Sequence, residues 1–394
     1  MLSVAAALDR ILALMAPVGT ERVPLARAGG RVLAEPVRAR RTQPPFPASA
    51  MDGYALRRAE ASPGARLRVI GTAQAGARFA GTLGPGEAVR IFTGAPVPEG
   101  ADDILIQEDA ARDGDWITVA EGRDEAPYIR PAGTDFAKGL EVAAPRRLRP
   151  ADIALLAAMN VAEVTVRRRP VVALIPTGDE LVMPGEVPGP DQIVSSNNFG
   201  LAALFEGIGA APRLLPVARD TERSLAAALG AAMGADLIVT LGGASVGDHD
   251  LVRQVAGAAG LDLAFYRVAV RPGKPLTAGR IGGVPMVGLP GNPVSAMVCG
   301  HVFLRPALDA LLGLPAGPLP REGGVLGCDL GPNGPREHYM RARLTDRAGE
   351  VVVTPFERQD SSLLSVLAAA EVLMVREAGD GALRAGAPVR FIRL

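Results

Sequence analysis

The chain has 394 residues, of which 48% are hydrophobic, so it is long enough to fold into several domains with separate cores. Its 42 basic residues balance 42 acidic ones and only 4% of the chain is aromatic, which argues against a nucleic-acid-binding surface. Two cysteines and three histidines lie far apart in the sequence, which excludes a disulfide framework and makes a histidine-based zinc site improbable.

The N-terminus is predicted to be an amphipathic helix rather than a signal peptide. Leu8, Ile11 and Met15 follow helical spacing, and no basic residue precedes Arg10. A short strand is expected at residues 31–34. Because no charge-free apolar run approaches the roughly 18 residues that span a bilayer, we expect a soluble, cytoplasmic protein.

Residues 45–130 have the pattern of a small antiparallel β domain, with short strand-like runs between Gly-Pro and Asp-Gly turns. Three predicted strands are residues 66–70, 87–92 and 116–119. A helix is predicted at residues 150–159. We expect residues 1–44 and 131–169 to form one discontinuous N-terminal linking domain, into which the β domain is inserted.

Three segments of this first half concentrate polar side chains at turns. The proline-rich approach to Asp52 carries Ser49 and Tyr54, Thr93 follows a predicted strand, and the segment Arg130–Asp135 holds a cation and a carboxylate. Each has a simpler interpretation. Asp52 begins an Asp-Gly dipeptide typical of a hairpin, Thr93 fits a strand-ending turn, and Arg130–Asp135 fits a surface ion pair.

From residue 170 strands and helices alternate, which predicts a mostly parallel sheet with helices on both faces over residues 170–316. Predicted strands are residues 171–175, 213–216, 236–241, 263–270 and 285–289. Predicted helices are residues 198–208, 221–233, 252–259 and 294–312. Residues 317–394 return to short strands and predict a β-barrel-like domain. The fold class is therefore α/β plus β, with several domains.

Three glycine-bearing loops follow predicted strands of the sheet: Thr240–Asp250, Arg271–Pro275 and Gly288–Ala296. In open sheets, ligands bind beyond the carboxyl ends of the strands, so these loops should gather there. Glycine lets backbone N–H groups approach an oxyanion, and Lys274 adds positive charge. Asp248 and Asp250 add carboxylates suited to Mg²⁺. The loops predict a phosphate-bearing ligand held with a metal.

The segment Thr177–Glu180 adds two adjacent carboxylates directly after a predicted buried strand. Such a pair is costly unless it holds a metal or a proton. The alternative is a helix N-cap, formed by Thr177 or Asp179, and Asp250 is likewise a candidate cap for the next helix. Neither a Walker P-loop nor a Gly-x-Gly-x-x-Gly turn is present.

Seven segments in this order resemble the molybdopterin molybdenumtransferases, the MoeA-type enzymes that share their core with the gephyrin E domain. They are Ser49-Ala-Met-Asp-Gly-Tyr-Ala55, Thr93-Gly-Ala-Pro-Val-Pro98, Arg130-Pro-Ala-Gly-Thr-Asp135, Pro176-Thr-Gly-Asp-Glu-Leu181, Gly242-Gly-Ala-Ser-Val-Gly247, Pro272-Gly-Lys-Pro275 and Leu289-Pro-Gly-Asn-Pro293. The resemblance implies a homodimer in which one subunit's α/β domain meets the β domain of the other. The implied reaction inserts molybdenum from molybdate into adenylated molybdopterin and releases AMP with the help of Mg²⁺.

The resemblance also implies roles for individual residues. Implied catalytic residues are Asp52, Thr93, Asp135, Glu180 and Asp250, with Glu180 and Asp250 as the metal ligands. Implied substrate-binding residues are Arg130, Ser245, Asp220, Arg267, Arg271, Lys274, Pro290, Pro293 and Ser361. Arg267 and Arg271 stand where many members of the family have lysine, which keeps the charge and changes its geometry to a fork.

Two other functions compete with the insertase. A molybdopterin adenylyltransferase shares the α/β core, but the segment Met51–Tyr54 and the inserted β domain argue against it. A non-catalytic, gephyrin-like scaffold would not need the carboxylates, yet Asp52, Asp135, Glu180 and Asp250 are all present. Transient contacts with other cofactor-biosynthesis proteins and with apo-molybdoenzymes are expected partners of the insertase.

Overall fold

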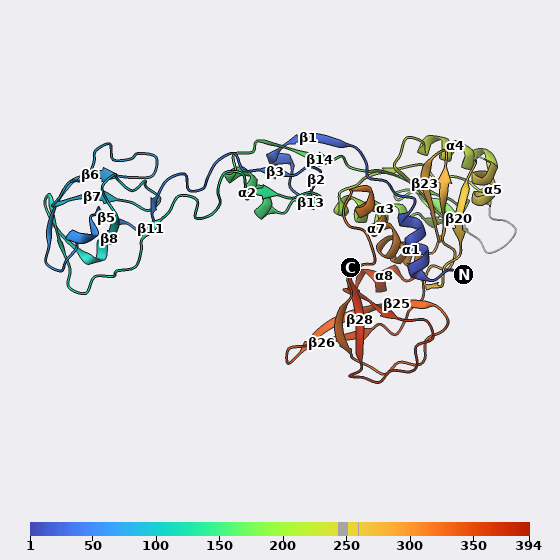
Figure 1. Ribbon diagram of the computed structural model, residues 1–394. Coiled ribbons are helices and arrows are strands. Elements are labelled where there is room, and N and C mark those ends of the chain that lie inside the picture. Colours follow the sequence, from blue (N-terminus) through green and yellow to red (C-terminus); the bar gives the residue numbers. More distant parts are fainter. Residues whose placement is uncertain (243–250, 259) are drawn as a thin grey trace. The chain divides into compact units, whose positions relative to one another are not determined.

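The computed structural model describes residues 1–242, 251–258 and 260–394 (Figure 1). It contains two compact units, one formed by Met1–Glu21 with Val166–Leu394, and the other by Arg22–Thr165.

The central element of the unit Arg22–Thr165 is a six-stranded sheet. In spatial order its strands are β8 (Asp103–Ile106), β5 (Gly53–Leu56), β7 (Glu87–Ile91), β6 (Arg66–Ala73), β10 (Trp116–Val119) and β9 (Ala110–Asp113). All pairs are antiparallel except β6 with β7. Leu56, Leu105 and Ile117 are fully buried in the core of this sheet. The three strands predicted here from the sequence are confirmed.

The same unit carries helix α2 (Pro150–Ala158) and several two-stranded pairings. β3 (Val37–Arg38) pairs with β12 (Glu141–Val142), and β4 (Ala48–Ser49) pairs with β11 (Ile129–Arg130). A four-stranded sheet has the order β1 (Thr20–Pro24), β14 (Glu163–Arg167), β2 (Val32–Leu33) and β13 (Arg146–Arg147). Segments before and after the six-stranded sheet therefore pair with each other, as expected for an insertion.

The α/β part of the other unit is built on a second six-stranded sheet. Its order is β18 (Ala211–Leu214), β15 (Val171–Pro176), β19 (Leu237–Leu241), β23 (Val284–Leu289), β22 (Thr277–Ile281) and β20 (Asp262–Tyr266). The first four strands are parallel, which confirms the mostly parallel sheet. β22 and β20 are antiparallel, and the sequence pattern missed β22.

One predicted strand of this region is divided in the structure. Residues 263–270 form β20 and β21 (Val270–Arg271), which belong to different sheets. Between them Arg267 has a φ of 80°, in the left-handed region that interrupts a strand. The apolar run alone could not reveal this backbone turn.

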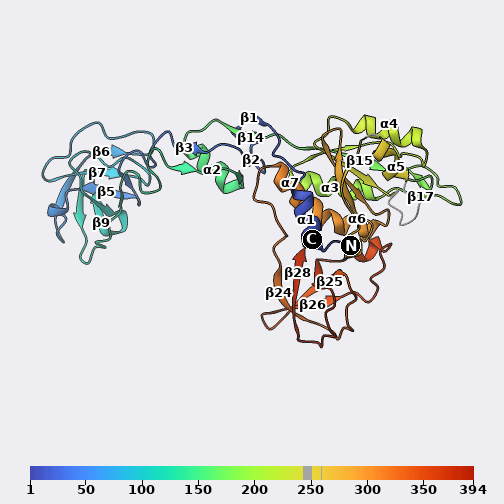
Figure 2. The same ribbon diagram turned by 45° about the vertical axis from the view of Figure 1, so that its right-hand side comes forward.

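Helices cover both faces of the parallel sheet (Figures 1 and 2). α4 (Glu222–Ala232) and α5 (Leu251–Ala258) pack together on one face. On the other face lie α1 (Val4–Leu12), α3 (Asn197–Ile208) and the helical run of α6 (Pro293–Cys299), a π-turn (Gly300–Leu304) and α7 (Arg305–Leu311). The run Pro293–Leu311 is long and apolar enough to cross a membrane, but 72% of it is buried in the protein, as in the core helix of a soluble protein.

The structure places α1 differently from the domain division expected from the sequence. α1 contacts α7, β20 and β22, and Arg10 Nη1 donates a hydrogen bond to the Ala264 carbonyl at 2.9 Å. Its apolar face, which includes Leu8 and Ile11, is buried in these contacts. Residues 1–21 therefore belong to the unit of the α/β sheet.

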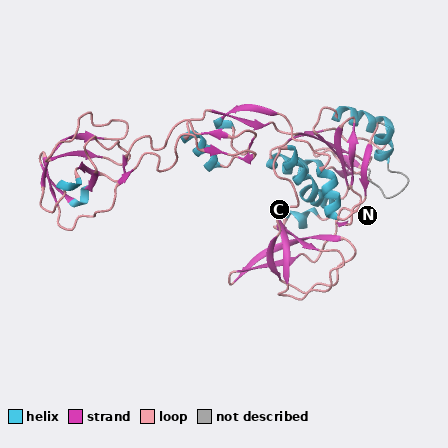
Figure 3. Ribbon diagram, in the orientation of Figure 1, coloured by secondary structure: helices cyan, strands magenta, loops and turns pink. Residues whose placement is uncertain are grey.

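The C-terminal strands close into a barrel, as predicted (Figure 3). Around the ring they are β25 (Glu337–Arg347), β26 (Glu350–Pro355), β24 (Glu322–Leu326), β28 (Pro388–Arg393) and β27 (Val372–Arg376), which pairs again with β25. β21 extends this sheet by pairing with β25, so that Arg271 and His338 are register partners. The short helix α8 (Leu364–Ala368) contacts α6.

Candidate functional site

A cavity of about 560 Å³ opens beyond the carboxyl ends of the central parallel strands. Strands β15, β19 and β23 end at Pro176, Leu241 and Leu289, and the residues at or directly after these ends form part of its wall. The wall also includes the Pro290–Pro293 loop and Ser195–Asn197 at the start of α3. This is the position expected for a ligand site in an open α/β sheet.

Close backbone packing beside the cavity requires glycine. Gly242 has a φ of 99°, and a Cβ there would lie 2.7 Å from the Thr177 carbonyl oxygen. A Cβ on Gly291 would lie 3.5 Å from the Gly242 Cα. Two of the predicted glycine loops therefore meet at one edge of the sheet, and Pro275 brings the third loop to the cavity wall.

Glu180 lines this cavity, whereas the alternative of a helix cap at Thr177–Glu180 is wrong. Residues after Thr177 form a turn and then β16 (Leu181–Val182), which pairs with β17 (Ile193–Val194). The Glu180 carboxylate folds against Gly178, where a Cβ would come within 2.3 Å of Oε2. Asp179 does not line the cavity, and its Oδ1 accepts the Asp220 backbone N–H at 3.1 Å.

Two asparagine side chains hold the Pro290–Pro293 loop from opposite sides. Asn197 Nδ2 donates to the Gly291 carbonyl at 2.7 Å. Asn292 Nδ2 donates to Ser361 Oγ at 2.9 Å, and the Val294 N–H donates to the Ser361 carbonyl at 3.0 Å. Ser361 thus acts as a support of the loop, and its neighbour Ser362 contributes to the cavity wall. The sequence pattern singled out neither asparagine side chain.

Arg341 is the site candidate that sequence reasoning missed. It is fully buried on β25, and its Nη2 donates to the carbonyl oxygens of Asp360 at 2.9 Å and Arg358 at 3.4 Å. Its Nε and Nη1 have no hydrogen-bond partner in the described structure. Burial lowers the pKa of the guanidinium, opposed by Asp360, and Arg271 lowers it further. A buried cation with unpartnered nitrogens is thus bonded to the backbone of Asp360, two residues before the lining residue Ser362.

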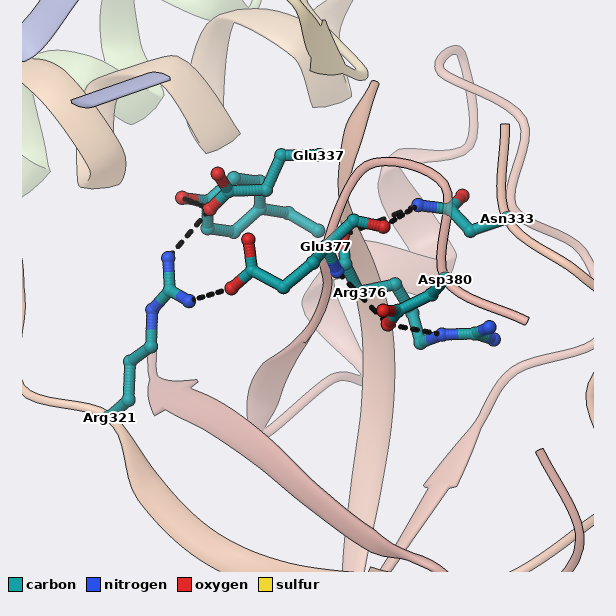
Figure 4. Close-up of polar contacts among 7 residues, drawn as sticks. Arg321, Asn333, Glu337, Arg376, Glu377 and Asp380 are labelled. Carbon is teal, nitrogen blue, oxygen red and sulfur yellow. Dashed lines mark hydrogen bonds and ion pairs between the residues drawn. The ribbon is translucent and has the colours of Figure 1, made fainter. Parts of the chain in front are cut away.

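Other carboxylates of the barrel are paired with other arginines (Figure 4). Glu337 accepts from Arg321 Nη2 at 2.6 Å and from the Tyr339 hydroxyl at 2.8 Å. Arg376 Nε pairs with Asp380 at 3.2 Å. Among the described residues no carboxylate forms an ion pair with Arg341, so its charge is not compensated within the barrel.

The predicted cations occupy different positions. Arg271 is exposed and lies close enough to lower the pKa values of Arg336, His338 and Arg341. Arg267 stacks on the Tyr266 ring, with 4.8 Å between its Cζ and the ring centroid. Arg267 and Lys274 are half-buried, and neither lines the 560 Å³ cavity, although Lys274 immediately precedes the lining residue Pro275.

In the other unit, Asp52 and Thr93 form a pair that the sequence pattern did not reveal. Thr93 donates to Asp52 Oδ1 through both its backbone N–H and its hydroxyl, each at 2.7 Å. These two bonds, with a smaller contribution from Arg90, lower the Asp52 pKa. Asp52 is therefore a fixed carboxylate anchored to the loop that follows β7.

A second cavity, of about 470 Å³, lies beside this pair, with Gly94 in its wall. Arg130 and Asp135 both line it, which confirms that the segment brings a cation and a carboxylate together. The surface ion pair of the simpler interpretation does not form between these two residues. Arg41 also lines the cavity, and the sequence pattern missed it.

The remaining predicted residues of the Thr240–Asp250 loop are Ser245, Asp248 and Asp250. All three lie outside the described residues, so the structure does not test Asp250 as the second metal ligand. Within residues that the structure describes, no three His, Cys, Asp or Glu side chains cluster in a way that could hold a metal.

Three family models together match most of the chain. The MoeA N-terminal region (domain I and II) matches residues 2–160, a probable molybdopterin binding domain matches residues 173–310, and the MoeA C-terminal region (domain IV) matches residues 324–394. A Nostoc protein named molybdopterin molybdenumtransferase is 35% identical over 388 residues, which cover 95% of this chain and 89% of the relative. The chain belongs to the molybdopterin molybdenumtransferase family.

Other relatives agree with this assignment. Molybdopterin molybdenumtransferase 2 of Mycobacterium tuberculosis is 42% identical over 346 residues, covering 84% of each chain. The solved structure of a molybdopterin biosynthesis MoeA protein from Pyrococcus horikoshii matches with a TM-score of 0.84 and 28% identity, covering 100% of both chains. As a member of this family of transferases, the chain is an enzyme of molybdenum cofactor biosynthesis.

Proposed function

We propose that the enzyme inserts molybdenum from molybdate into adenylated molybdopterin and releases AMP in a Mg²⁺-dependent reaction. The observation that carries this proposal is the 560 Å³ cavity at the carboxyl ends of β15, β19 and β23, with Glu180 and the Pro290–Pro293 loop in its wall. A cavity of this volume is of the size that holds a small-molecule ligand. Its position and its wall, which includes polar side chains and Gly291, suit a phosphate-bearing pterin.

The basic residues behind the cavity supply charge for oxyanions. Two nitrogens of Arg341, Nε and Nη1, have no acceptor in the described structure, and leaving a buried donor unpaired costs roughly 1–3 kcal/mol. Molybdate is a tetrahedral dianion that the charge of buried Arg341 would attract, and Arg271 and Lys274 would add attraction from nearby. By holding the anion away from bulk water, these residues would strengthen each electrostatic contact and orient the oxygens that sulfur replaces.

The carboxylates at the cavity are compatible with Mg²⁺. Glu180 presents an exposed carboxylate at the wall, and Asp250 is the residue before α5 in the sequence. Mg²⁺ is usually bound through one or two carboxylates together with substrate phosphates and water, so a larger cluster of protein ligands is not needed. Glu180 and Asp250 would hold the ion, which supplies charge neutralisation during cleavage of the phosphoanhydride.

We further propose that the enzyme acts as a cytoplasmic homodimer. The resemblance implies that Asp52, Thr93, Arg130 and Asp135 complete the active site from the partner subunit. Mixing an Asp52→Asn variant with a Glu180→Gln variant tests this arrangement, because mixed dimers contain one intact cleft. Recovery of up to about a quarter of wild-type activity after subunit exchange supports the homodimer, and no recovery despite exchange contradicts the shared site.

AMP release from adenylated molybdopterin tests the proposed reaction. With the purified enzyme and Mg²⁺, release should depend on added molybdate. Glu180→Gln and Asp250→Asn should keep the fold and abolish insertion, whereas Asp191→Asn, an exposed carboxylate outside the cavity wall, should retain it. Near-normal insertion by Glu180→Gln or Asp250→Asn would overturn the assigned roles. Binding without turnover by the wild type would favour a scaffold.

A further inference from the structure

The 470 Å³ cavity of the unit Arg22–Thr165 has an excess of positive charge. Its charged lining residues are Arg41, Arg130 and Asp135. Two cations against one carboxylate leave the cavity positive, and a concave surface concentrates such a field. An anionic ligand would therefore be attracted to it.

Arg41 lacks an acidic partner among the described residues, in contrast to two arginines that lie close to it in the sequence or in the same unit. Arg22 pairs with Glu163 at 2.9 Å, and Arg38 pairs with Glu141 at 3.0 Å. Arg41 and Arg130 make no ion pair within the described structure. Exposed arginines without an ion pair in the described structure also occur outside the cavity, as at Arg40, so the distinguishing feature of Arg41 and Arg130 is that both line one cavity.

The backbone on either side of Arg41 is fixed. The Arg40 N–H donates to the Met159 carbonyl at 3.0 Å, and the Gln43 N–H donates to the Phe136 carbonyl at 2.8 Å. Thr42 Oγ1 accepts the Lys138 N–H at 3.1 Å. The opposite wall is also fixed, since Arg130 and Ala48 are register partners of β11 and β4. Both guanidinium groups thus extend from a backbone that needs little ordering when a ligand binds.

We propose that Arg41 is a further ligand-binding residue, and that it acts with Arg130 to hold an oxyanion group of the substrate in this cavity. The inference rests on the proposed function for the identity of the substrate. A guanidinium fork matches the geometry of phosphate and of other tetrahedral oxyanions, which accept two parallel hydrogen bonds. The group held is either a phosphate of the adenylated pterin or molybdate, and the two sources can be separated by experiment.

Arg40 provides a matched control, because it is the adjacent residue, is also exposed and does not line the cavity. Arg41→Gln, Arg41→Lys and Arg40→Gln are compared in the full-length enzyme. The first assay measures KM and kcat for adenylated molybdopterin and for molybdate. The second measures binding of pyrophosphate and of molybdate by calorimetry, in the absence of the pterin.

We expect Arg41→Gln to raise the KM of one of the two substrates by about tenfold to a hundredfold, as loss of a charged hydrogen-bonding group does. The substrate affected identifies the oxyanion. The KM of Arg41→Lys should lie between those of the wild type and Arg41→Gln, since lysine keeps the charge but cannot form two parallel hydrogen bonds. Arg40→Gln should change KM less than about twofold. Added salt should weaken binding to the wild type more than to Arg41→Gln, because an exposed charge is screened.

Equal KM values for Arg41→Gln and Arg40→Gln, in an enzyme that turns over, would overturn the inference and leave the proposed function intact. If the wild type does not turn over, the proposed function fails, and the binding assay decides the inference. Loss of pyrophosphate or molybdate binding in Arg41→Gln alone would then support it. Unchanged binding of both probes would refute it. A circular dichroism spectrum of each variant identifies any that fail to fold.

Discussion

Replacing Arg341 by methionine should make the enzyme more stable and less active. The substitution keeps most of the side-chain volume and removes a buried charge with two unpartnered nitrogens, Nε and Nη1. Each unpartnered donor costs roughly 1–3 kcal/mol, against which the two hydrogen bonds to the Asp360 and Arg358 carbonyls contribute about 1 kcal/mol each. Replacing buried charges by apolar groups is commonly neutral or stabilising by roughly 1–4 kcal/mol. We expect a net gain of about 1–2 kcal/mol.

Arg376→Met is the control for this substitution. Arg376 is also buried on the barrel, but it pairs with Asp380 and donates to the Gly331 and Gly381 carbonyls. Its loss should destabilise the barrel by more than about 2 kcal/mol, because it leaves these partners unpaired. The two arginines therefore have opposite expected effects although both are buried cations of the same barrel.

Hydrogen exchange of β25 amides, followed by mass spectrometry, measures the change in local stability, and calorimetry measures molybdate binding. Arg341→Met should exchange more slowly than the wild type and bind molybdate at least tenfold more weakly. A loss of more than about 2 kcal/mol of protection in Arg341→Met, with unchanged binding of molybdate, would refute the reasoning. Arg341 would then be a structural residue of the barrel.

Three further changes test other parts of the structure. Gly53→Ala should destabilise the six-stranded sheet by more than about 3 kcal/mol, because its Cβ would lie 2.0 Å from the Leu105 carbonyl oxygen. Urea unfolding, monitored through the single tryptophan, measures this loss of stability. Burial, aided by nearby arginines, lowers the pKa of His338 to about 3, below its ordinary value of 6.5. The free energy of unfolding should therefore be highest above about pH 6.5 and should fall as the pH drops toward 3. The free energy of unfolding should be about 2 kcal/mol lower at pH 5 than above pH 6.5. His338→Gln should remove this pH dependence, which acid unfolding curves measure. Asn197→Ala should raise the KM for the pterin about tenfold with little change in kcat, because the 2.7 Å hydrogen bond to the Gly291 carbonyl is lost. An unchanged KM would show that the Pro290–Pro293 loop does not depend on this hydrogen bond.

Much of the fold could be predicted because the sequence follows simple periods. The strand at residues 116–119 and the α/β alternation after residue 170 reflect period-two and helical patterns that match burial in the structure. What could not be predicted depends on contacts between distant segments. α1 is amphipathic, but only its partners α7, β20 and β22 determine that it joins the α/β unit.

The candidate site shows the same division. Glycines that permit close backbone approach, such as Gly242, carry a local signal in the sequence, and so does the carboxylate of Glu180 after a buried strand. Arg341 carries none, because an arginine in a strand reads as solvent-facing until burial and the engagement of nearby carboxylates are known. Arg41 is likewise one of many arginines until the cavity places it beside Arg130.

Transfer of active cofactor to an apo-molybdoenzyme is the most direct test of the proposed insertase. The purified enzyme is incubated with adenylated molybdopterin, Mg²⁺ and molybdate, and AMP and molybdoenzyme activity are measured in the same samples. We expect both products to appear together, in equal amounts, and only when molybdate is present. AMP release that does not depend on molybdate, or the absence of active cofactor, would contradict molybdenum insertion by this enzyme.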